Sequence, residues 1–279
     1  MRTILVTGAS GFLGKYLVKH LSGKGYSVIG TCLSESNTKK LERVVESHKL
    51  TNVKLFNVDI VSDKNQLKRI VQKNSVDTII HAAALKHVGI CENNPTRAIK
   101  TNVVGSLNVL DIAIECDVRN VLAISTDKAE EPSGTYGMTK KLMEEMFLDA
   151  GFGVFRGVNF LFSSESVLEV WEDLVKRKEP LLVNRVATRY FSTIQEIVQK
   201  IADSMSVNKI VSIDSCYEVK ISDLQAAFSE CHDYWNVKDY APLSIEKEIE
   251  KLPIDGIQIK KIGVDSIVKL LQEFYDQKV

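Results

Sequence analysis

A short run in the middle of the chain, ISTDKAEEPSGTYGMTK from Ile124 to Lys140, holds side chains that could transfer protons. Tyr136 and Lys140 are four positions apart, so on a helix they share one face. A phenol has an ordinary pKa of about 10 and is a poor base at neutral pH. A nearby ammonium group lowers that pKa because it favours the phenolate. The pair is therefore suited to taking a proton from a substrate hydroxyl while a hydride leaves the same carbon.

A charged pair, Asp127 and Lys128, stands just after a strand pattern at residues 121–124. In parallel α/β sheets, ligands bind beyond the carboxyl ends of the strands. Either the pair lies in a solvated turn, or it performs acid–base work on a second part of the substrate. The second interpretation fits an elimination, which a simple dehydrogenase does not perform.

Three glycines near the start of the chain, Gly8, Gly11 and Gly14 in VTGASGFLGKYL, separate the first strand pattern from the first helix pattern. Gly8 allows a tight turn, Gly11 lets the backbone approach a pyrophosphate, and Gly14 lets the helix pack on the strand. The helix N-terminus would stabilise the phosphate charge. The context indicates dinucleotide binding, with a purely structural glycine turn as the alternative.

The end of the second strand pattern bears on the choice between NAD and NADP. An acidic residue there would bind the adenosine ribose hydroxyls and repel a 2′-phosphate, but the residues at 31–33 are Thr, Cys and Leu. Ser34 could hydrogen-bond a 2′-phosphate, and the lysines at 39–40 could approach it. We expect NADP, with NAD as the alternative. Asp59, after the third strand pattern, is placed either to reach the adenine ring or to cap the next turn.

The elements that must position these groups alternate regularly through the first half of the chain. Short apolar runs predict strands at residues 3–7, 27–29, 53–56, 78–80, 121–124 and 153–155. Amphipathic patterns predict helices at residues 12–21, 38–47, 64–72, 95–115 and 136–148. Strands this apolar, alternating with helices, indicate a parallel sheet covered on both faces. The expected fold is α/β, a Rossmann-like doubly wound parallel sheet.

The pattern changes after about Gly157. Short helices are expected at residues 167–177, 193–205, 222–231 and 264–276, with short strands such as 180–183 among them. We expect a dinucleotide-binding domain at residues 1–157 and a smaller C-terminal substrate lobe at residues 158–279, partly interleaved with the first. The least regular segment is about residues 233–256.

Composition excludes several classes of function. The formal net charge of 0 gives no electrostatic case for nucleic acid or an anionic membrane surface. No apolar run approaches the roughly 20 residues that span a bilayer, and the strand pattern at residues 3–7 leaves no room for a signal peptide. The five cysteines are scattered without a CxxC pair, so we expect free thiols, a cytoplasmic location and no metal.

One longer stretch resembles a known family. HAAALKHVGICENNPTRAIKTNVVGSLNVLDIA, followed by ISTDKAEEPSGTYGMTK, closely resembles the UDP-N-acetylglucosamine 4,6-dehydratase family of polysaccharide-biosynthesis enzymes, which are extended short-chain dehydrogenase/reductases. The similarity runs from Thr3 to about Leu148 and continues more weakly through FRGVNF and ATRYFSTIQEIVQKI. The combination of LKHV with STDKA is the specific part, because most relatives carry Glu at the position of Lys128.

The chain departs from the family pattern at three places. Gly134 replaces the usual Asn two positions before Tyr136, and Met138 replaces a small residue. The stretch FLFSSESVLE at residues 160–169 replaces a glycine-rich segment that helps to hold the nucleotide. The last departure leaves the contacts to uridine diphosphate open.

The resemblance implies an internal redox cycle on a UDP-sugar. Tyr136, assisted by Lys140 and by Thr126 or Ser125, would deprotonate the C4 hydroxyl while a hydride passes to the cofactor. The resulting ketone acidifies the C5 proton, which Lys128 would remove. Protonated Asp127 would donate to the C6 hydroxyl, which leaves as water. Hydride return to C6 gives a 4-keto-6-deoxy sugar, with C5 inverted or not.

The resemblance also extends the expected site beyond these residues. Lys86 and His87 would lie close to the sugar and nicotinamide, although His87 could equally be structural. Asn102 would lie near the catalytic face, or it could bond a distorted backbone turn. Asn159 and Arg189 are expected to bind substrate, Arg189 through its diphosphate. Further cofactor contacts are expected from Ser10, Phe12, Leu13, Ile60, Ala82, Ala83 and Ala84.

Two rival functions use the same fold. A nucleotide-sugar 4-reductase or 4-epimerase of the same superfamily would share the glycines and Tyr136 with Lys140, but it does not require both Asp127 and Lys128. A non-catalytic NADP-sensing regulator is expected to have lost the Tyr or Lys. Because relatives often assemble, we expect a homo-oligomer in which helices near residues 95–115 and 136–148 pair.

Overall fold

The computed structural model describes residues 2–162, 166–239 and 257–277. The chain divides into two compact units: the first comprises residues 1–157 and 195–212, and the second comprises residues 158–194 and 213–279. The range 158–279 expected for the substrate lobe thus includes residues 195–212, which the structure groups with the first unit. The irregular segment expected near residues 233–256 lies mostly outside the described residues.

The first unit is built on a seven-stranded sheet in the order β10-β6-β5-β4-β1-β2-β3, with every neighbouring pair parallel. The order reverses direction between β1 and β4, which makes this a doubly wound sheet. Its strands are β1 (Thr3–Thr7), β2 (Ser27–Cys32), β3 (Val53–Asn57), β4 (Thr78–His81), β5 (Asn120–Thr126), β6 (Gly153–Gly157) and β10 (Ile210–Ser212). The expected fold class is confirmed.

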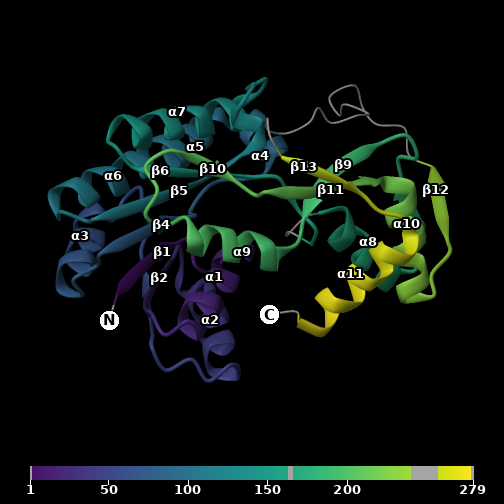
Figure 1. Cartoon of the computed structure of the whole chain (residues 1–279), viewed down its shortest axis with the longest axis horizontal. Coiled ribbons are helices and arrows are strands. Elements are labelled where there is room, and N and C mark those ends of the chain that lie inside the picture. The colour runs from purple at the N-terminus through teal and green to yellow at the C-terminus, as the bar shows by residue number, and fades with distance from the viewer. Residues whose placement is uncertain (1, 163–165, 240–256, 278–279) are drawn as a thin grey trace. The chain divides into compact units, whose positions relative to one another are not determined.

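Helices cover both faces of this sheet (Figure 1). On one face lie α1 (Phe12–Gly23), α2 (Glu35–Ser47) and α9 (Ile194–Asp203), and on the other lie α3 (Lys64–Lys73), α6 (Ser106–Glu115) and α7 (Thr135–Asp149). Two short helices, α4 (Val88–Asn93) and α5 (Pro95–Ile99), precede α6. None of the helices in the described part of the chain has the length and hydrophobicity that a membrane crossing needs.

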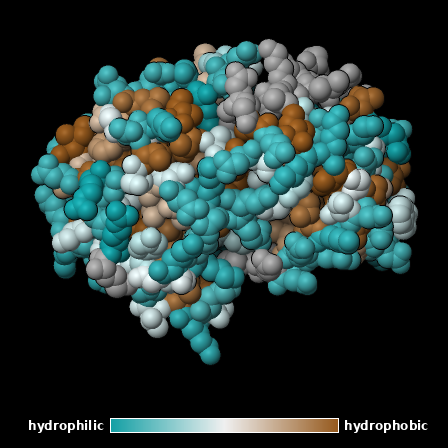
Figure 2. Space-filling model, viewed as in Figure 1, coloured by the Kyte–Doolittle hydropathy of each residue, from teal (hydrophilic) through white to brown (hydrophobic). Residues whose placement is uncertain are grey.

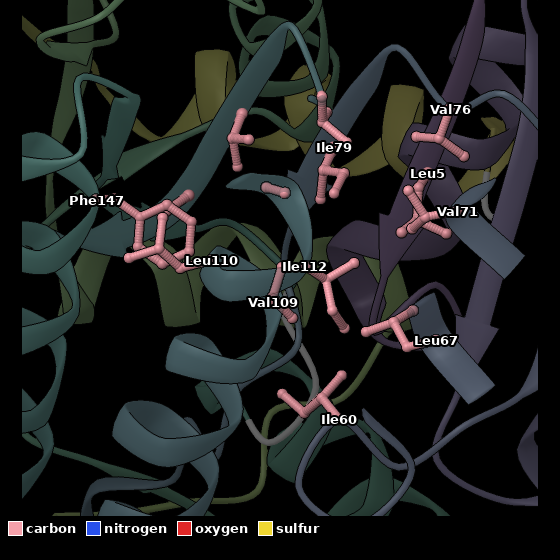
Figure 3. Packing of buried hydrophobic residues seen from close by; sticks show 14 of the residues in the cluster. Leu5, Ile60, Leu67, Val71, Val76, Ile79, Val109, Leu110, Ile112 and Phe147 are labelled. Atoms are coloured by element: carbon pink, nitrogen blue, oxygen red, sulfur yellow. The ribbon is translucent and has the colours of Figure 1, made fainter. Parts of the chain in front are cut away.

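The main core fills the space between the sheet and the helices α3, α6 and α7 (Figure 3). It contains Leu5 and Ile79 from the sheet, Leu67 from α3, Ile112 from α6 and Phe147 from α7. All five side chains are at most 1% exposed. This packing holds α7, which carries Tyr136 and Lys140, against the strands whose ends form the expected site.

The helix expected at residues 95–115 is not regular throughout. Between α5 and α6, the segment Lys100–Gly105 (η1) forms a π-helical turn with widened hydrogen bonds. Such turns occur frequently at functional sites. Here the turn carries Asn102, one of the expected site residues.

The second unit contains two small sheets and three helices in its described part. One sheet has the order β13-β11-β9-β7, and the other pairs β12 with β8. The elements are β7 (Asn159–Phe160), α8 (Val167–Arg177), β8 (Leu181–Val183), β9 (Thr188–Ser192), β11 (Ser215–Lys220), α10 (Ile221–His232), β12 (Val237–Asp239), β13 (Gln258–Lys261) and α11 (Val264–Gln277). Trp171 of α8 and Phe228 of α10 are fully buried neighbours in this unit.

Several of these strands are absent from the sequence-based expectation. Strands β10 and β12 are three residues long, which is too short for an alternating pattern to be recognised. β10 nevertheless completes the edge of the main sheet beside β6.

Candidate active site

The glycine loop forms a close turn at the carboxyl end of β1. Gly8 has a φ of +66°, and a Cβ there would lie 2.7 Å from the Cα of Ala83. A Cβ on Gly14 would collide with the carbonyl oxygen of Gly8. Helix α1 begins just after Gly11 without a hydrogen bond from a side-chain cap within the described residues. The first turn of α1 therefore presents backbone N–H groups that suit a phosphate.

The other expected residues of this loop have packing contacts. Ser10 hydrogen-bonds the thiol of Cys32 at the end of β2, Leu13 is buried, and the Phe12 ring lies 5.3 Å from that of Tyr16. Near the same strand end, the Oγ1 of Thr31 is buried without a hydrogen-bond partner among the described residues. An orphaned hydroxyl beside the glycine loop fits a ligand that is polar at this end.

Ser34 caps helix α2, since its Oγ accepts a hydrogen bond from the Asn37 N–H at 3.3 Å. Lys39 pairs with Glu35 at 2.7 Å. Ser34 and Lys39, two of the three residues expected to favour a 2′-phosphate, therefore already have protein partners, although the Glu35–Lys39 pair is exposed.

Asp59 caps the turn that follows β3. Its Oδ1 accepts a hydrogen bond from the Val61 N–H at 2.9 Å, which is the capping role that the sequence left as an alternative. The adjacent Ile60 is buried, and its side chain is close enough to η1 that a Cβ on Gly105 would lie 2.8 Å from it.

A buried chain of hydrogen bonds links the glycine loop strand to η1. The Ala83 N–H donates to Thr7 Oγ1 at 3.2 Å, Thr7 Oγ1 lies 2.8 Å from His81 Nδ1, and His81 Nε2 lies 2.9 Å from Ser106 Oγ. Since Ser106 donates its own proton to the Asn102 carbonyl at 2.7 Å, it must accept from Nε2–H. Burial, with Lys140 as a second cause, lowers the pKa of His81 to about 3, which favours the neutral ring with its proton on Nε2.

Asn102 holds the loop that contains Ala84, Lys86 and His87. Its Oδ1 accepts from the Leu85 N–H at 2.7 Å, and its amide donates to the Leu85 carbonyl at 3.0 Å and to Thr139 Oγ1 at 3.1 Å. These bonds give Asn102 a structural role at the loop that follows β4. Lys86 is exposed and His87 half-buried, both at the start of α4.

Lys140 is buried and directed toward the end of β5. Its Nζ donates to the Ile124 carbonyl at 2.6 Å and contacts Met143 Sδ at 3.1 Å. Burial lowers the pKa of Lys140 to about 8, and the charge of Glu144 opposes this shift. The Lys140 ammonium therefore releases its proton more readily than that of an exposed lysine.

The pKa of Tyr136 does not follow the sequence-based expectation. The Lys140 ammonium was expected to lower it, but burial first, and the Asp127 charge second, raise the pKa of Tyr136 above its ordinary value. Only a hydrogen bond with Thr126 is a resolved cause in the other direction. The expectation is wrong for the chain by itself, because Lys140 bonds the Ile124 carbonyl and burial disfavours any charge on the phenol.

Thr126, Asp127 and Lys128 form one hydrogen-bonded turn where β5 ends. The Thr126 hydroxyl donates to Asp127 Oδ1 at 2.7 Å, and Lys128 Nζ lies 3.3 Å from the same oxygen. The Asp127 side chain is 6% exposed, whereas that of Lys128 is 37% exposed. Because the Asp127 side chain is buried, Asp127 and Lys128 do not form a fully solvated turn, which was the alternative interpretation. Ser125 Oγ is buried here without a partner among the described residues.

Helix α7 is fitted closely to this turn. A Cβ on Gly137, next to Tyr136, would collide with the Lys128 carbonyl oxygen. At the start of α7, Glu92 accepts a hydrogen bond from Thr135 Oγ1 at 2.9 Å, and a Cβ on Gly134 would lie 2.6 Å from its carboxylate. The glycine that departs from the family pattern therefore makes room for an acidic group that caps the helix.

A buried ion pair stands behind the site. Arg156 on β6 makes two hydrogen bonds to Glu144 on α7, at 2.9 and 2.7 Å, and a weaker contact to Glu130 at 3.4 Å. The sequence reasoning missed these residues. Glu144 follows Lys140 by one helical turn, and this spacing on the buried face was the available signal.

The two expected substrate residues of the second unit bond within that unit. The Asn159 amide donates to the Tyr190 carbonyl at 3.1 Å, and an Arg189 Nη1–H donates to the Thr188 carbonyl at 3.0 Å. In the described part of the chain, no group of three or more His, Cys, Asp or Glu side chains could hold a metal ion.

Comparison with known proteins gives consistent findings. A family model described as "Polysaccharide biosynthesis protein" matches residues 4–267. An uncharacterized membrane protein of Methanocaldococcus jannaschii is 33% identical, over 98% of this chain and 80% of that protein. A UDP-N-acetylglucosamine 4,6-dehydratase (inverting) of Campylobacter jejuni is 31% identical, over 82% of this chain and 71% of that one. Other curated relatives are covered over smaller shares of their length, down to 39%.

Solved structures share the fold at lower identity. The structure of DesIV, a dTDP-glucose 4,6-dehydratase from Streptomyces venezuelae with NAD bound, matches with a TM-score of 0.81 and 18% identity. The match covers 99% of this chain and 98% of that one. At this identity the likeness establishes the architecture.

Proposed function

The chain belongs to the polysaccharide biosynthesis protein family, and on that premise we propose that it is a nucleotide-sugar 4,6-dehydratase acting on UDP-N-acetylglucosamine. One observation carries the proposal. The acid and ammonium of Asp127 and Lys128 lie in one hydrogen-bonded turn with Thr126, which also bonds Tyr136. Tyr136 and Lys140, which suit the redox steps, thus lie at the same edge of the sheet as Asp127 and Lys128, which suit the elimination.

The residues present fit a dinucleotide. The turn at Gly8, the uncapped start of α1 and the orphaned Thr31 hydroxyl suit its phosphate and adenosine ends. We propose that Gly8, Gly11 and Gly14, with their neighbours Ser10 to Leu13, hold the pyrophosphate. The rest of the cofactor site would be lined by Asp59, Ile60, Ala82 to Ala84 and Asn102. When bound, the oxidised nicotinamide would accept a hydride from C4 and return one to C6.

NADP rather than NAD is our proposal for this cofactor. No acid stands at residues 31–33 to repel a 2′-phosphate, and Ser34 caps a helix whose N-terminus favours negative charge. The Glu35–Lys39 pair is exposed, so Lys39 can exchange its partner for a phosphate at little cost.

Tyr136 would take the proton of the C4 hydroxyl. Thr126 bonds the phenol, and the orphaned Ser125 hydroxyl is buried one residue earlier and can bond the same sugar oxygen. Because Asp127 opposes ionisation of the phenol, protonating Asp127 would favour the phenolate. Lys140, whose proton is labile near pH 8, can then exchange protons at the back of the site.

Lys128 and Asp127 would carry out the elimination. Lys128, as the free amine, takes the proton from C5 next to the new ketone. Protonated Asp127 donates to the C6 hydroxyl, so the C6–O bond breaks and water leaves while a C5–C6 double bond forms. Lys86 and His87 are proposed to orient the sugar, and Asn159 and Arg189 of the second unit, the proposed substrate-binding unit, to contact the UDP-sugar.

Incubation with UDP-N-acetylglucosamine and no added reductant tests both proposals. Protein reconstituted with oxidised NADP should give a 4-keto product lighter by one water, and protein reconstituted with NAD should give less. Mass spectrometry and proton NMR in deuterated water report water loss and exchange at C5. A product of unchanged mass, or consumption of stoichiometric NADPH, would instead identify a 4-epimerase or a 4-reductase. Equal turnover with NAD would contradict the cofactor preference.

We also propose a homo-oligomer formed through α6 and α7. Leu107 and Ile114 on α6 and Met138 and Leu142 on α7 are exposed by 43 to 56%, and Figure 2 shows hydrophobic residues gathered over this region. Apolar patches on a protein surface often mark protein–protein interfaces. A second copy of the same face is the proposed occupant, since both helices were expected to pair. We place the protein in the cytoplasm, where its five free thiols would stay reduced.

The Leu142→Glu substitution is expected to shift the protein from dimer to monomer in light scattering. Losing a buried leucine in each copy, worth about 1.5–3 kcal/mol apiece, weakens association by roughly a hundredfold or more. Val186→Glu, at an equally exposed apolar position in the second unit, is the matched control and should leave the mass unchanged. If the unmodified protein is a monomer at micromolar concentration, the interface does not exist.

A further inference from the structure

Arg156 connects two segments that the proposed mechanism uses separately. Its guanidinium forms a bidentate pair with Glu144, which is 0% exposed and lies on α7 one turn after Lys140. A third nitrogen, Nη1, lies 3.4 Å from Glu130, two residues after Lys128. One side chain thus contacts both the helix of Tyr136 and the turn of Asp127.

The position of Arg156 in the sheet makes it a fixed anchor. It lies on β6 between two paired strands, opposite Ser125 of β5 and Ser212 of β10. The Ser212 hydroxyl also donates to the Arg156 carbonyl at 2.7 Å. Residues opposite each other on neighbouring strands point to the same face of a sheet, so the guanidinium lies on the same face as the buried Ser125 hydroxyl.

The charges explain why an arginine is needed here. Glu144 is buried and close enough to Lys140 to oppose the lowering of the Lys140 pKa. A buried carboxylate without its own cation would be strongly destabilising. The bidentate fork holds both Glu144 oxygens, and the remaining nitrogen is left for Glu130. The carboxylate of Glu130 is more exposed, at 36% of its side chain, so this arm is the weaker one.

We propose that Arg156 is a positioning residue that holds α7, with Tyr136 and Lys140, in a fixed position relative to the turn of Asp127 and Lys128. Its contact with Glu130 would support the elimination step. This inference rests on the proposed function. Loss of the contact to Glu144 would leave a buried charge without its partner and would destabilise the fold. Loss of the contact to Glu130 would loosen only the turn. The two arms can therefore be tested apart.

The decisive variant is Glu130→Gln, with Glu115→Gln as the matched control, because Glu115 pairs with Lys68 on the exposed side of α6. In ligand-free protein, hydrogen–deuterium exchange over residues 127–134 should rise in Glu130→Gln and stay at the wild-type level in the control. With UDP-N-acetylglucosamine, water loss should slow about fivefold, as for a partly exposed ion pair. C4 oxidation should keep its rate, so reduced cofactor accumulates.

Arg156→Lys keeps the positive charge but not the fork, and should slow water loss at least as much as Glu130→Gln. The inference is overturned if hydrogen–deuterium exchange over residues 127–134 stays at the wild-type level in Glu130→Gln. It is also overturned if the rate of water loss relative to C4 oxidation is unchanged. If the wild-type protein itself releases no water, the proposed function fails. The exchange measurement, which needs no substrate, still decides whether Arg156 holds the turn.

Discussion

Replacing Tyr136 by phenylalanine is expected to lower the rate of water loss by roughly 10²–10⁴-fold, the usual contribution of a positioned acid–base group. The substitution removes one oxygen from a site where Thr126 bonds it. The ring and the packing of α7 on the Asp127 turn stay, since Gly137 and Lys128 are unaffected. Because C4 oxidation comes first, neither reduced cofactor nor product should form.

Cofactor binding separates this result from misfolding. Titration with oxidised NADP is expected to quench the intrinsic fluorescence of Tyr136→Phe to the same extent as that of the wild-type protein. Tyr26→Phe, the same chemical change at a half-buried position far along the chain from the site, should keep wild-type activity. If Tyr136→Phe retained more than about a tenth of the wild-type rate, another group would be the base.

Lys128→Ala is expected to stop water loss while C4 oxidation continues, so absorbance of reduced cofactor in the near ultraviolet should rise and persist. The substitution removes the amine that would take the C5 proton, a loss again of about 10²–10⁴-fold in that step. The bonds of Thr126 to Asp127 and of Lys140 to the Ile124 carbonyl remain. Oxidation and elimination thereby become separable.

Two measurements check this outcome. In deuterated water, the wild-type product should carry deuterium at C5, whereas sugar recovered from Lys128→Ala should carry none. Lys141→Ala, which removes an exposed lysine of α7 paired with Glu145, should behave as wild type. Water loss at the wild-type rate in Lys128→Ala would show that Lys128 is not the base.

Much of the first unit could be predicted from the sequence because its signals are local. A fully buried parallel strand needs a continuous apolar run, as at residues 3–7 and 121–124, and every such run in the first half forms a strand. The turn at Gly8 likewise follows from the residue itself, since a positive φ and the nearby Ala83 backbone leave no space for a side chain.

The tertiary structure alone decided the electrostatics of the site. Spacing put Tyr136 and Lys140 on one face of α7, but the partner of Lys140 is a carbonyl at the end of β5, and the charge that reaches Tyr136 belongs to Asp127. Arg156 contacts Glu144 and Glu130 only because β6 pairs with β5 and α7 packs against both strands. Propensity and periodicity depend on neighbours in the chain, whereas pKa values and buried ion pairs depend on groups that folding brings together.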